Sequence, residues 1–554
     1  MKKRDSLNAY IQWAIRDNWD LMSLSDFDGI QLQYRDVARK IAKLHILYNK
    51  AGIKPGDKIA LCGKNSTHWA VAFLATVTYG AIAVTILHDF TPESVEALVT
   101  HSDSKILFAD KTIWENIQAE NIANVHTVID IYNYAVLYTA KKEVKEARYH
   151  LNMLFGEEFP ERFTPEDVTY EEFTPDTPAV INYTSGSTGS PKGVILSHRA
   201  LWSNLQYCID GLTFLKPGDG VVCMLPLAHM FGLMVDLLHC FTKGCHIHFI
   251  TRLPTPRVLL GALAEVKPKL VVSVPLVIEK IIRNNVFPKL KTNAMRIGLK
   301  LPGIKDAICK QIRKSIINAF GGQLLQLIIG GASLSREVEE FLRRIQFPFT
   351  VGYGMTECAP LIAYAPWDVQ RPQSCGRVVH RMECRIDSPD PAHTPGVLWV
   401  KGDNVMDGYY KNKEATDAVF KDGWMNTGDI CTRDNDGFLY IRGRAKTMIL
   451  GASGQNIYPE EIENMINATE GVEESLVISE GGKLIALIYP NKEDDNIKAM
   501  SPEEIKQAME TNISALNTKL PAYSKISGVR IMDEEFKKTP KRSIKRYEYQ
   551  KSNE

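Results

Sequence analysis

The sequence predicts an α/β fold with a large N-terminal domain of several subdomains and a small, mobile α+β domain at the C-terminal end. Three observations lead to this prediction. The chain of 554 residues is too long for one compact core. Helix-like and strand-like stretches alternate over residues 34–110 and again over 179–441. After Arg444, short strands and helices mix with many charges, which is typical of a separate small domain.

The composition is that of an ordinary soluble protein, with 45% hydrophobic and 24% charged residues. Lys and Arg number 66 and Asp and Glu 65, so the net charge of +1 gives no reason to expect a nucleic-acid partner. The 10 cysteines contain no CxxC pair, which argues against a zinc cluster or a disulfide framework and fits a reducing cytoplasm. The basic N-terminus is followed by no apolar stretch, so we expect no secretory signal.

The first predicted sheet is parallel and covered by helices. Its elements alternate in the order helix 34–51, strand 58–63, uncharged segment 69–87, helix 92–101 and strand 105–110. Residues 112–175 are less regular, with charged helical pieces and prolines, and we expect them to form a connecting region on the surface.

The uncharged segment 69–87 is long enough to span a bilayer. Tyr79 and Gly80 interrupt it, and Asn65 or Ser66 can cap a helix at its start. Its second half, AIAVTI, is typical of a buried parallel strand. We therefore predict a helix and a strand in place of a transmembrane span.

Three Gly-rich turns follow apolar strands between residues 179 and 441: INYTSGSTG, LIIGGAS and FTVGYGMTE. Ligands of open parallel sheets bind beyond the carboxyl ends of the strands, so we expect a nucleotide-sized crevice there. Glycines of the first turn let backbone N–H groups converge on an anion, and its hydroxyls and Lys192 add donors and charge. It is not a Walker loop, because Pro191 stands where that pattern needs its second glycine. A plain surface linker would lack the Pro-Lys-Gly ending, so we predict a Gly-rich phosphate loop.

Residues 183–193 resemble the phosphate-binding signature of the AMP-forming adenylating superfamily. That superfamily includes acyl-CoA synthetases, the adenylation domains of peptide synthetases and beetle luciferases. Further motifs agree in order and spacing from about residue 30 to the C-terminal end, and the agreement is weak only over 112–175. The resemblance implies ATP and Mg²⁺ as cofactors and a phosphate cradle formed by Thr184, Ser185, Gly186, Ser187, Thr188, Gly189 and Lys192.

The stretch YGMTE at residues 353–357 resembles the second core motif of this family. By resemblance, Tyr353 stacks on adenine beside Gly354, and Thr356 contacts the phosphate as a catalytic residue. Glu357 would hold Mg²⁺ together with Thr184, which suits a hard cation that prefers oxygen ligands.

Further positions resemble the family's contacts to adenosine, namely Gly331, Ala332, Asp429 and Arg444. Asp429 would accept hydrogen bonds from the ribose hydroxyls, a role suited to a carboxylate. A strand-to-helix turn at the first pair and an Asx-turn before Asp429 are the plain alternatives. Lys446 matches the hinge position of the family. The residues that match its loop for thioester formation are Gly451, Gly454 and Gln455.

Residues 225–232 (LPLAHMFG) resemble the segment beside the acyl pocket, with His229 near the carboxylate that is activated. A lone histidine among apolar residues is more often a core residue, but the flanking pattern favours the site. Residues 273–281 and 404–420 resemble the long-chain fatty acyl-CoA synthetase branch.

The C-terminal motif departs from the family pattern. Ser543 occupies the position of the lysine that neutralises charge during adenylation, and serine cannot supply that charge. Lys541 is the predicted catalytic substitute, with Lys545 and Arg542 as alternatives. A different interpretation is a protein that binds a nucleotide or an acyl-adenylate with impaired adenylation. The basic run is also compatible with a solvated or lipid-facing tail.

The resemblance as a whole implies a ligase that forms acyl-AMP from a medium- or long-chain fatty acid and ATP and passes the acyl group to coenzyme A. Acyl carrier protein as acceptor, or an aromatic acid as substrate, are alternatives within the same chemistry. The expected domains are an AMP- and acyl-binding domain at 1–443, a hinge at 444–446 and a lid at 447–554. We expect a cytoplasmic enzyme, with reversible peripheral contact at the inner membrane face as an option.

Overall fold

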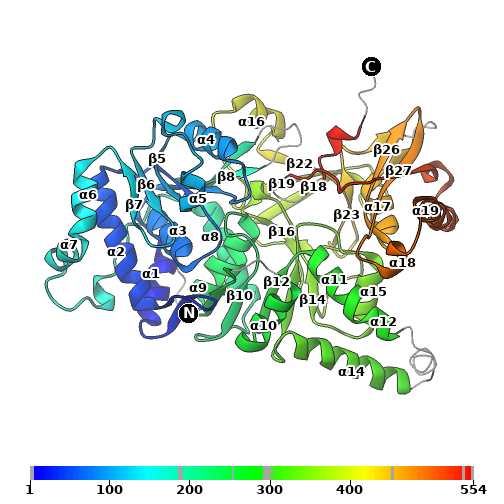
Figure 1. Cartoon of the computed structure of the whole chain (residues 1–554), viewed down its shortest axis with the longest axis horizontal. Helices are drawn as coiled ribbons and strands as arrows, with labels where there is room; N and C mark the ends of the chain where they lie inside the picture. The colour runs from blue at the N-terminus through cyan, green and yellow to red at the C-terminus, as the bar shows by residue number, and fades with distance from the viewer. Residues whose placement is uncertain are drawn as a thin grey trace.

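The largest sheet has eight strands in the order β20-β9-β8-β4-β3-β5-β6-β7 (Figure 1). The computed structural model describes residues 5–184, 191–251, 255–290, 301, 303–450, 455–539 and 543–550. Neighbours from β8 to β6 pair in parallel, whereas β7, β9 and β20 pair antiparallel at the two edges. The predicted parallel sheet is therefore confirmed at the centre and is mixed at its edges. The bounds are β3 (Lys58–Cys62), β4 (Ile82–Ile86), β5 (Ser104–Ala109), β6 (Thr127–Asp130), β7 (Val136–Thr139), β8 (Pro178–Thr184), β9 (Lys192–Ser197) and β20 (Gly408–Tyr409).

Helices lie beside this sheet where the sequence predicts them. Two of them, α2 (Tyr34–Ala51) and α4 (Pro92–His101), have the predicted bounds. The end of α2 is fixed by Gly52, which takes the left-handed conformation at φ 69° that glycine adopts without strain. The other elements of this region are α1 (Leu7–Asp17), α5 (Lys111–Trp114), η1 (Ala119–Ile122) and η2 (Pro165–Asp167).

The uncharged segment forms a helix and a strand, as predicted. The hydroxyl of Ser66 accepts a hydrogen bond from the backbone N–H of Trp69 and caps α3 (Thr67–Tyr79). Gly80 ends the helix at φ 84°, and the chain continues into β4, whose five residues are all buried. Among the described residues, no helix is long and apolar enough to cross a membrane.

The expectation of a surface connection over residues 112–175 is wrong in part. The strand β6 lies inside the sheet, and all of its residues are buried. Two helices, α6 (Lys142–Tyr149) and α7 (Leu151–Glu158), follow and pack against α2. The strand escapes sequence analysis because four residues are too few to show a period, and its neighbours are charged or polar.

Two smaller sheets follow in the middle of the chain, in the orders β10-β11-β1-β2 and β12-β13-β14. The second is wholly parallel, and in the first only β2 pairs antiparallel. Their strands are β1 (Met22–Asp26), β2 (Gln31–Gln33), β10 (Gly220–Cys223), β11 (His246–Phe249), β12 (Leu270–Ser273), β13 (Gln326–Ile329) and β14 (Phe349–Val351). Their helices are α8 (His198–Gly211), the π-helix η3 (Gly232–His239), α9 (Cys240–Thr242), α10 (Pro256–Val266), α11 (Pro275–Asn285), α12 (Phe287–Leu290), α14 (Ile304–Ala319) and α15 (Arg336–Arg344).

Antiparallel strands join these layers to the rest of the chain. One sheet has the order β15-β16-β17, and another has five strands, β18-β19-β22-β21 with β23 on β22. The bounds are β15 (Tyr353–Gly354), η4 (Thr356–Cys358), β16 (Leu361–Tyr364), β17 (Arg377–Val378), β18 (Met382–Asp387), β19 (Gly396–Gly402), α16 (Lys413–Val419), β21 (Phe420–Lys421), β22 (Trp424–Arg433) and β23 (Leu439–Arg444).

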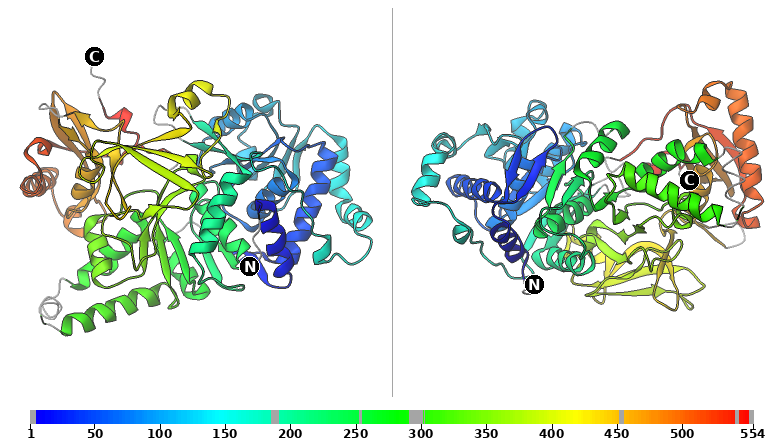
Figure 2. Two further views of the ribbon diagram at one scale, coloured as in Figure 1. Left: turned by 180° about the vertical axis from the view of Figure 1, so that it is seen from behind. Right: turned by 90° about the horizontal axis from the view of Figure 1, so that it is seen from below.

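Residues from Ile449 on build apolar clusters of their own, around the sheet β26-β27-β28. They lie at the end of the molecule away from α6 and α7 (Figure 2). Lys280 of α11 forms an ion pair of 2.7 Å with Glu473 across to this part. The domain boundary at 444–446 stays a prediction. The elements are β24 (Ile449–Leu450), β25 (Asn456–Ile457), α17 (Pro459–Asn467), β26 (Val472–Glu480), β27 (Lys483–Pro490), α18 (Asp495–Lys498), α19 (Pro502–Asn517), η5 (Ala522–Ser524), β28 (Ile526–Ile531) and η6 (Arg546–Glu548).

Candidate active site

The base of the Gly-rich loop is a strand pair. Thr184 at the end of β8 lies opposite Lys192 at the start of β9, so the two ends of the loop are held together. The hydroxyl of Thr184 donates to the carbonyl of Lys192 over 3.5 Å. The predicted phosphate contacts between them lie outside the described residues and stay predictions: Ser185, Gly186, Ser187, Thr188 and Gly189.

Tyr409 joins the loop base to the YGMTE motif, and sequence analysis did not identify it as a site residue. Its ring lies 4.9 Å from the ammonium of Lys192, and its hydroxyl donates to Oε1 of Glu357 over 3.0 Å. Burial and the neighbouring Glu357 raise the pKa of Tyr409, so the phenol stays protonated. The only sequence hint was its place in the GYY of residues 404–420. The structure therefore brings Lys192 and Glu357 to one place through this tyrosine.

Tyr353, Asp429 and Arg444 come from three motifs and meet at one point. The hydroxyl of Tyr353 donates to Oδ2 of Asp429 over 2.5 Å, and Nε of Arg444 lies 2.7 Å from Oδ1. Asp429 is 3% exposed and Arg444 is 55% exposed, so the guanidinium can turn toward a ligand while the carboxylate stays fixed. Burial raises the pKa of Asp429, and the Arg444 charge opposes that rise.

The Asx-turn named as the plain alternative before Asp429 is present. The side-chain oxygen of Asn426 accepts from the N–H of Gly428 over 2.8 Å. This turn ends within β22, and it directs the carboxylate of Asp429 toward Tyr353. The turn and the placement of Asp429 are thus parts of one local structure.

The YGMTE motif bends back tightly on itself. A Cβ at Gly354 would lie 2.1 Å from the carbonyl oxygen of Pro360, so only glycine fits there. The N–H of Met355 donates to the same carbonyl over 2.8 Å. Thr356 is buried at the start of η4, and the carbonyl of Glu357 accepts from the N–H of Met406 over 2.8 Å. The bend therefore holds Glu357 beside Tyr409.

His229 lies between two of the predicted turns. Asn182 in β8 donates to the carbonyl of Ala228 over 2.7 Å. On the other side, a Cβ at Gly330 would lie 3.0 Å from the ring of Phe231, so the turn after β13 packs directly on this segment. The backbone N–H of Phe231 donates to Nδ1 of His229 over 3.3 Å. Since Nδ1 accepts, the proton of the neutral ring lies on Nε2.

Gly331 and Ala332 follow this packed glycine and are both exposed. Gly331 has φ +88°, which favours glycine and fits the tight turn that was the plain alternative. Their predicted contact with adenine stays a prediction.

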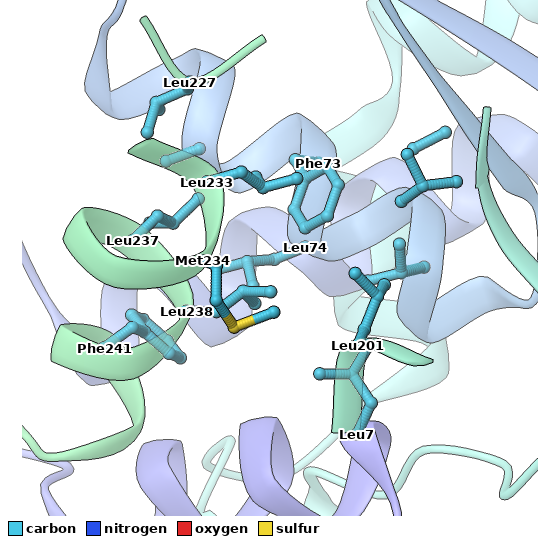
Figure 3. Close-up of a cluster of buried hydrophobic side chains, with 14 of the residues drawn as sticks. Leu7, Phe73, Leu74, Leu201, Leu227, Leu233, Met234, Leu237, Leu238 and Phe241 are labelled. Carbon is cyan, nitrogen blue, oxygen red and sulfur yellow. The ribbon is translucent and has the colours of Figure 1, made fainter. Parts of the chain in front are cut away.

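An apolar wall lies next to His229. Figure 3 shows Leu233, Met234 and Leu237 of η3 beside Phe73 and Leu74 of α3, all of them within one core cluster. Two polar side chains of η3, Asp236 and His239, are also fully buried. Burial raises the pKa of Asp236 well above its usual range, because a charged carboxylate is poorly solvated there.

The two described sides of the C-terminal motif pair with each other. Lys538 pairs with Ile544, and the N–H of Thr539 donates to the carbonyl of Ser543 over 2.8 Å. Ser543 is exposed. Lys541 and Arg542 lie outside the described residues, so their roles stay predictions.

Of the predicted substitutes for the missing lysine, Lys545 is described. Its ammonium lies 3.7 Å from the carboxylate of Glu548. A cation with a nearby carboxylate is a poorer charge donor to a nucleotide than one without. This pairing is a reason against Lys545 as the substitute.

The predicted hinge follows β23. Lys446 is exposed, and the next residue, Thr447, donates its hydroxyl to Glu460 of α17 over 2.5 Å. Gly451 and Gly454 lie outside the described residues, and Gln455 is exposed. The hinge and the loop for thioester formation stay predictions.

Family models account for most of the chain. The model described as AMP-binding enzyme matches residues 11–410, and the model of the C-terminal domain of AMP-binding enzymes matches residues 446–553. A long-chain-fatty-acid–CoA ligase of Yersinia pestis is 30% identical over 482 residues, which cover 82% of this chain and 79% of that protein. A long-chain-fatty-acid–CoA ligase of Escherichia coli O6:H1 is 29% identical over 448 residues, covering 76% of this chain and 74% of its own.

Solved structures show the same fold. ATP-bound MatB from Rhodopseudomonas palustris matches with a TM-score of 0.76 and 21% identity, covering 98% of each chain. The anthranilate CoA ligase AuaEII in complex with anthranoyl-AMP matches with a TM-score of 0.77 and 18% identity, covering 99% of this chain and 97% of that one. The predicted fold class is thus confirmed. Because the family models match well over half of its length, the chain belongs to the AMP-binding enzyme family, as an AMP-forming acyl-CoA synthetase.

Proposed function

We propose that this synthetase activates a medium- or long-chain fatty acid with ATP and transfers the acyl group to coenzyme A. The first step releases pyrophosphate and forms acyl-AMP, and the second releases AMP. The observation that carries the proposal is that one motif, residues 353–357, joins two groups: Glu357 contacts Tyr409 beside Lys192, and Tyr353 contacts Asp429 beside Arg444. The fatty acid is supported by the names of the relatives at 29% and 30% identity and by the apolar helix η3 after His229.

The adenosine end of ATP would lie against Tyr353, Asp429 and Arg444. A tyrosine face suits a purine, and a buried carboxylate is a fixed acceptor for two ribose hydroxyls. In the structure described here, Arg444 and Tyr353 already occupy that carboxylate. Ribose binding would therefore replace one of these contacts, and the exposed Arg444 is the group that can move.

The phosphates would lie over the Gly-rich loop and Lys192, with Thr356 as a further contact. Mg²⁺ usually keeps one or two protein carboxylates and completes its shell with water and phosphate oxygens. The hydroxyl of Thr184 and the carboxylate of Glu357 fit that pattern, because both are hard oxygen donors. Across the described ranges, no three His, Cys, Asp or Glu side chains gather into a cage of their own. When bound there, Mg²⁺ would neutralise phosphate charge that would otherwise repel the attacking carboxylate.

His229 would orient the fatty-acid carboxylate for attack on the α-phosphate. Its Nε2–H can donate to one carboxylate oxygen, since Nδ1 already accepts from the N–H of Phe231. The alkyl chain would follow the apolar side chains of η3 (Figure 3). The positive charge that the transition state needs would come from Lys541, in place of the lysine absent at Ser543.

The second step requires the lid at 447–554 to turn about Lys446, so that the loop at 451–455 replaces the segment of Lys541 at the reacting carbonyl. Such a motion lets one site serve two reactions. The proposal places the enzyme in the cytoplasm, with reversible contact to a membrane that supplies its substrate.

A panel of acids and acceptors tests this proposal. Octanoate, palmitate, oleate, anthranilate and o-succinylbenzoate would each be offered with coenzyme A or with acyl carrier protein, and thioester formation followed by mass spectrometry. The proposal predicts product with fatty acids and coenzyme A and at least about tenfold lower kcat/KM with the aromatic acids. If only the aromatic acids formed a thioester, the substrate would be an aromatic acid and not a fatty acid. If thioester formed only on acyl carrier protein, that protein and not coenzyme A would be the acceptor.

A further inference from the structure

A cavity of about 560 Å³ lies between α2 and the helices α6 and α7. Figure 1 shows these helices at the edge of the molecule away from β22 and β23, which carry Asp429 and Arg444. The volume falls within the ~300–1,000 Å³ that is usual for small-molecule sites. It is therefore a cavity separate from the adenylate site.

The charge of its lining is strongly one-sided. Four cationic side chains line it against a single carboxylate, that of Asp36. Arg39 lies 3.5 Å from Asp36. The other three cations have uncharged hydrogen-bond partners: Lys40 with Nε2 of His68 at 3.2 Å, Lys43 with Oδ1 of Asn152 at 2.7 Å, and Arg148 with the carbonyl of Tyr134 at 2.7 Å.

This arrangement is unfavourable without an anion. Lys43 lies four residues after Arg39 and three after Lys40 on α2, and both are spacings at which like charges repel. Burial and the charge of Lys43 lower the pKa of Lys40, and burial, Arg39 and Arg148 lower the pKa of Lys43. His68 cannot offset this charge, since burial lowers its pKa to about 4 and it stays neutral. A bound anion would relieve the repulsion.

The rest of the lining is mixed, with the amide side chains of Gln31, Asn133 and Asn152 beside apolar ones. Leu44 and Leu47 are already buried in the core, so the apolar side chains of the lining that stay partly exposed are Ile30, Tyr149 and Leu151. Ile30 is 36% exposed, so part of this surface faces solvent. An anion alone would leave these side chains uncovered, whereas an alkyl chain would cover them.

From the charge and the apolar lining together we infer that the cavity binds a single-chain anionic amphiphile. Its carboxylate or phosphate head would lie on Lys40, Lys43 and Arg148, and its chain on Ile30, Tyr149 and Leu151. Ammonium and guanidinium groups are the preferred partners of such heads. Nothing in the adenylation reaction needs these residues, so this is a second ligand site.

Calorimetric titration of the full chain tests the inference, with dodecyl phosphate and dodecanoate kept below their micelle concentrations. At least one of them should bind, and the tighter of the two identifies the head group. Inorganic phosphate and dodecyltrimethylammonium should bind at least about tenfold more weakly, because one lacks the chain and the other the negative charge. Equal binding of inorganic phosphate, or no binding of either anionic amphiphile, would overturn the inference.

Variants locate the site. Lys43→Gln should raise the Kd about tenfold and Lys43→Arg should keep it near the wild-type value, because a charge-assisted contact is lost only in the first. Lys142→Gln on α6 is the matched control, since Lys142 is 85% exposed and paired with Glu146. Hydrogen exchange should slow in α2 and α6 when the amphiphile binds. Unchanged affinity in Lys43→Gln, or protection confined to the strands around Asp429, would place the ligand in the adenylate site and refute the assignment.

Discussion

The hydroxyl of Tyr409 donates to Glu357 over 3.0 Å, and the ring that carries it lies 4.9 Å from the ammonium of Lys192. One side chain thus connects the base of the Gly-rich loop, which we propose to bind phosphate, with the residue proposed to hold Mg²⁺. The backbone supports this arrangement, because β20 pairs with β9 and the N–H of Met406 donates to the carbonyl of Glu357. Tyr409 therefore fixes the carboxylate orientation before any ligand arrives.

Replacing Tyr409 with phenylalanine should weaken adenylation. Tyr409→Phe removes one hydrogen bond to a carboxylate, worth roughly 1.5–3 kcal/mol, so kcat/KM for Mg·ATP should fall about tenfold or more. Pyrophosphate release at varied ATP measures it. Tyr410→Phe is the matched control, because the hydroxyl of Tyr410 binds Asp103 instead. Equal losses in the two variants would contradict a role for the Glu357 contact.

Asp429→Asn should erase the preference for a ribose 2′-hydroxyl. The carboxylate is 3% exposed and held between Tyr353 and Arg444, so it is a fixed acceptor for the sugar. We expect the wild type to react faster with ATP than with 2′-deoxy-ATP. In the variant, the ratio of these two rates should be about tenfold smaller. The two nucleotides control for each other, since a folding defect would lower both rates equally. An unchanged ratio would remove Asp429 from the ribose site.

Lys541→Ala should reduce pyrophosphate release by about a hundredfold or more while leaving the reaction of synthetic acyl-AMP with coenzyme A intact. Lys545→Ala should have a smaller effect, because Lys545 already pairs with Glu548. Adding Ser543→Lys to the Lys541→Ala variant should restore adenylation, since that position carries the lysine in the family pattern. A fully active Lys541→Ala enzyme would transfer the role to Arg542 or Lys545.

The ion pair of Glu463 with Arg546 fastens the C-terminal tail to α17, and the burial of Glu463 makes stability depend on pH. Burial raises the pKa of Glu463 from 4.5 to about 7, although Arg546 opposes the rise. The folded state therefore holds more protons between these values, and the free energy of unfolding should fall by about 2–3 kcal/mol from pH 4.5 to 7.

Urea unfolding of the C-terminal part at several pH values measures the slope of its free energy of unfolding against pH. Glu463→Gln should flatten the part of the slope that this carboxyl causes, since the amide does not titrate. Glu510→Gln, at an exposed position on α19, should leave the slope as in the wild type. The same slope in all three proteins would show that Glu463 titrates at an ordinary pH.

Local chemistry made parts of the fold predictable. Ser66 and Gly80 mark the two ends of α3 through a cap and a positive φ, and each effect acts within a few residues. The bounds of α2 and α4 followed from helical spacing in the same way. The buried strand β6 was missed because its burial depends on β5 and on a sheet that four residues cannot reveal.

The candidate site was also predictable only in part. Motifs indicated Tyr353, Asp429 and Arg444 one by one, but their contacts join residues 76 positions apart, as for Tyr353 and Asp429. Tyr409 carries no motif of its own, and only the pairing of β20 with β9 brings it to Glu357. The resemblance thus predicts which residues belong to the site, whereas the order of the strands determines which of them come into contact.

Release of pyrophosphate and AMP from Mg·ATP with palmitate, with and without coenzyme A, tests the central claim most directly. The account predicts pyrophosphate that depends on palmitate, and AMP with palmitoyl-CoA only when coenzyme A is added. ATP that binds without any release of pyrophosphate, under both conditions and with shorter fatty acids as well, would contradict it. The chain would then be a nucleotide-binding member of its family that does not adenylate fatty acids.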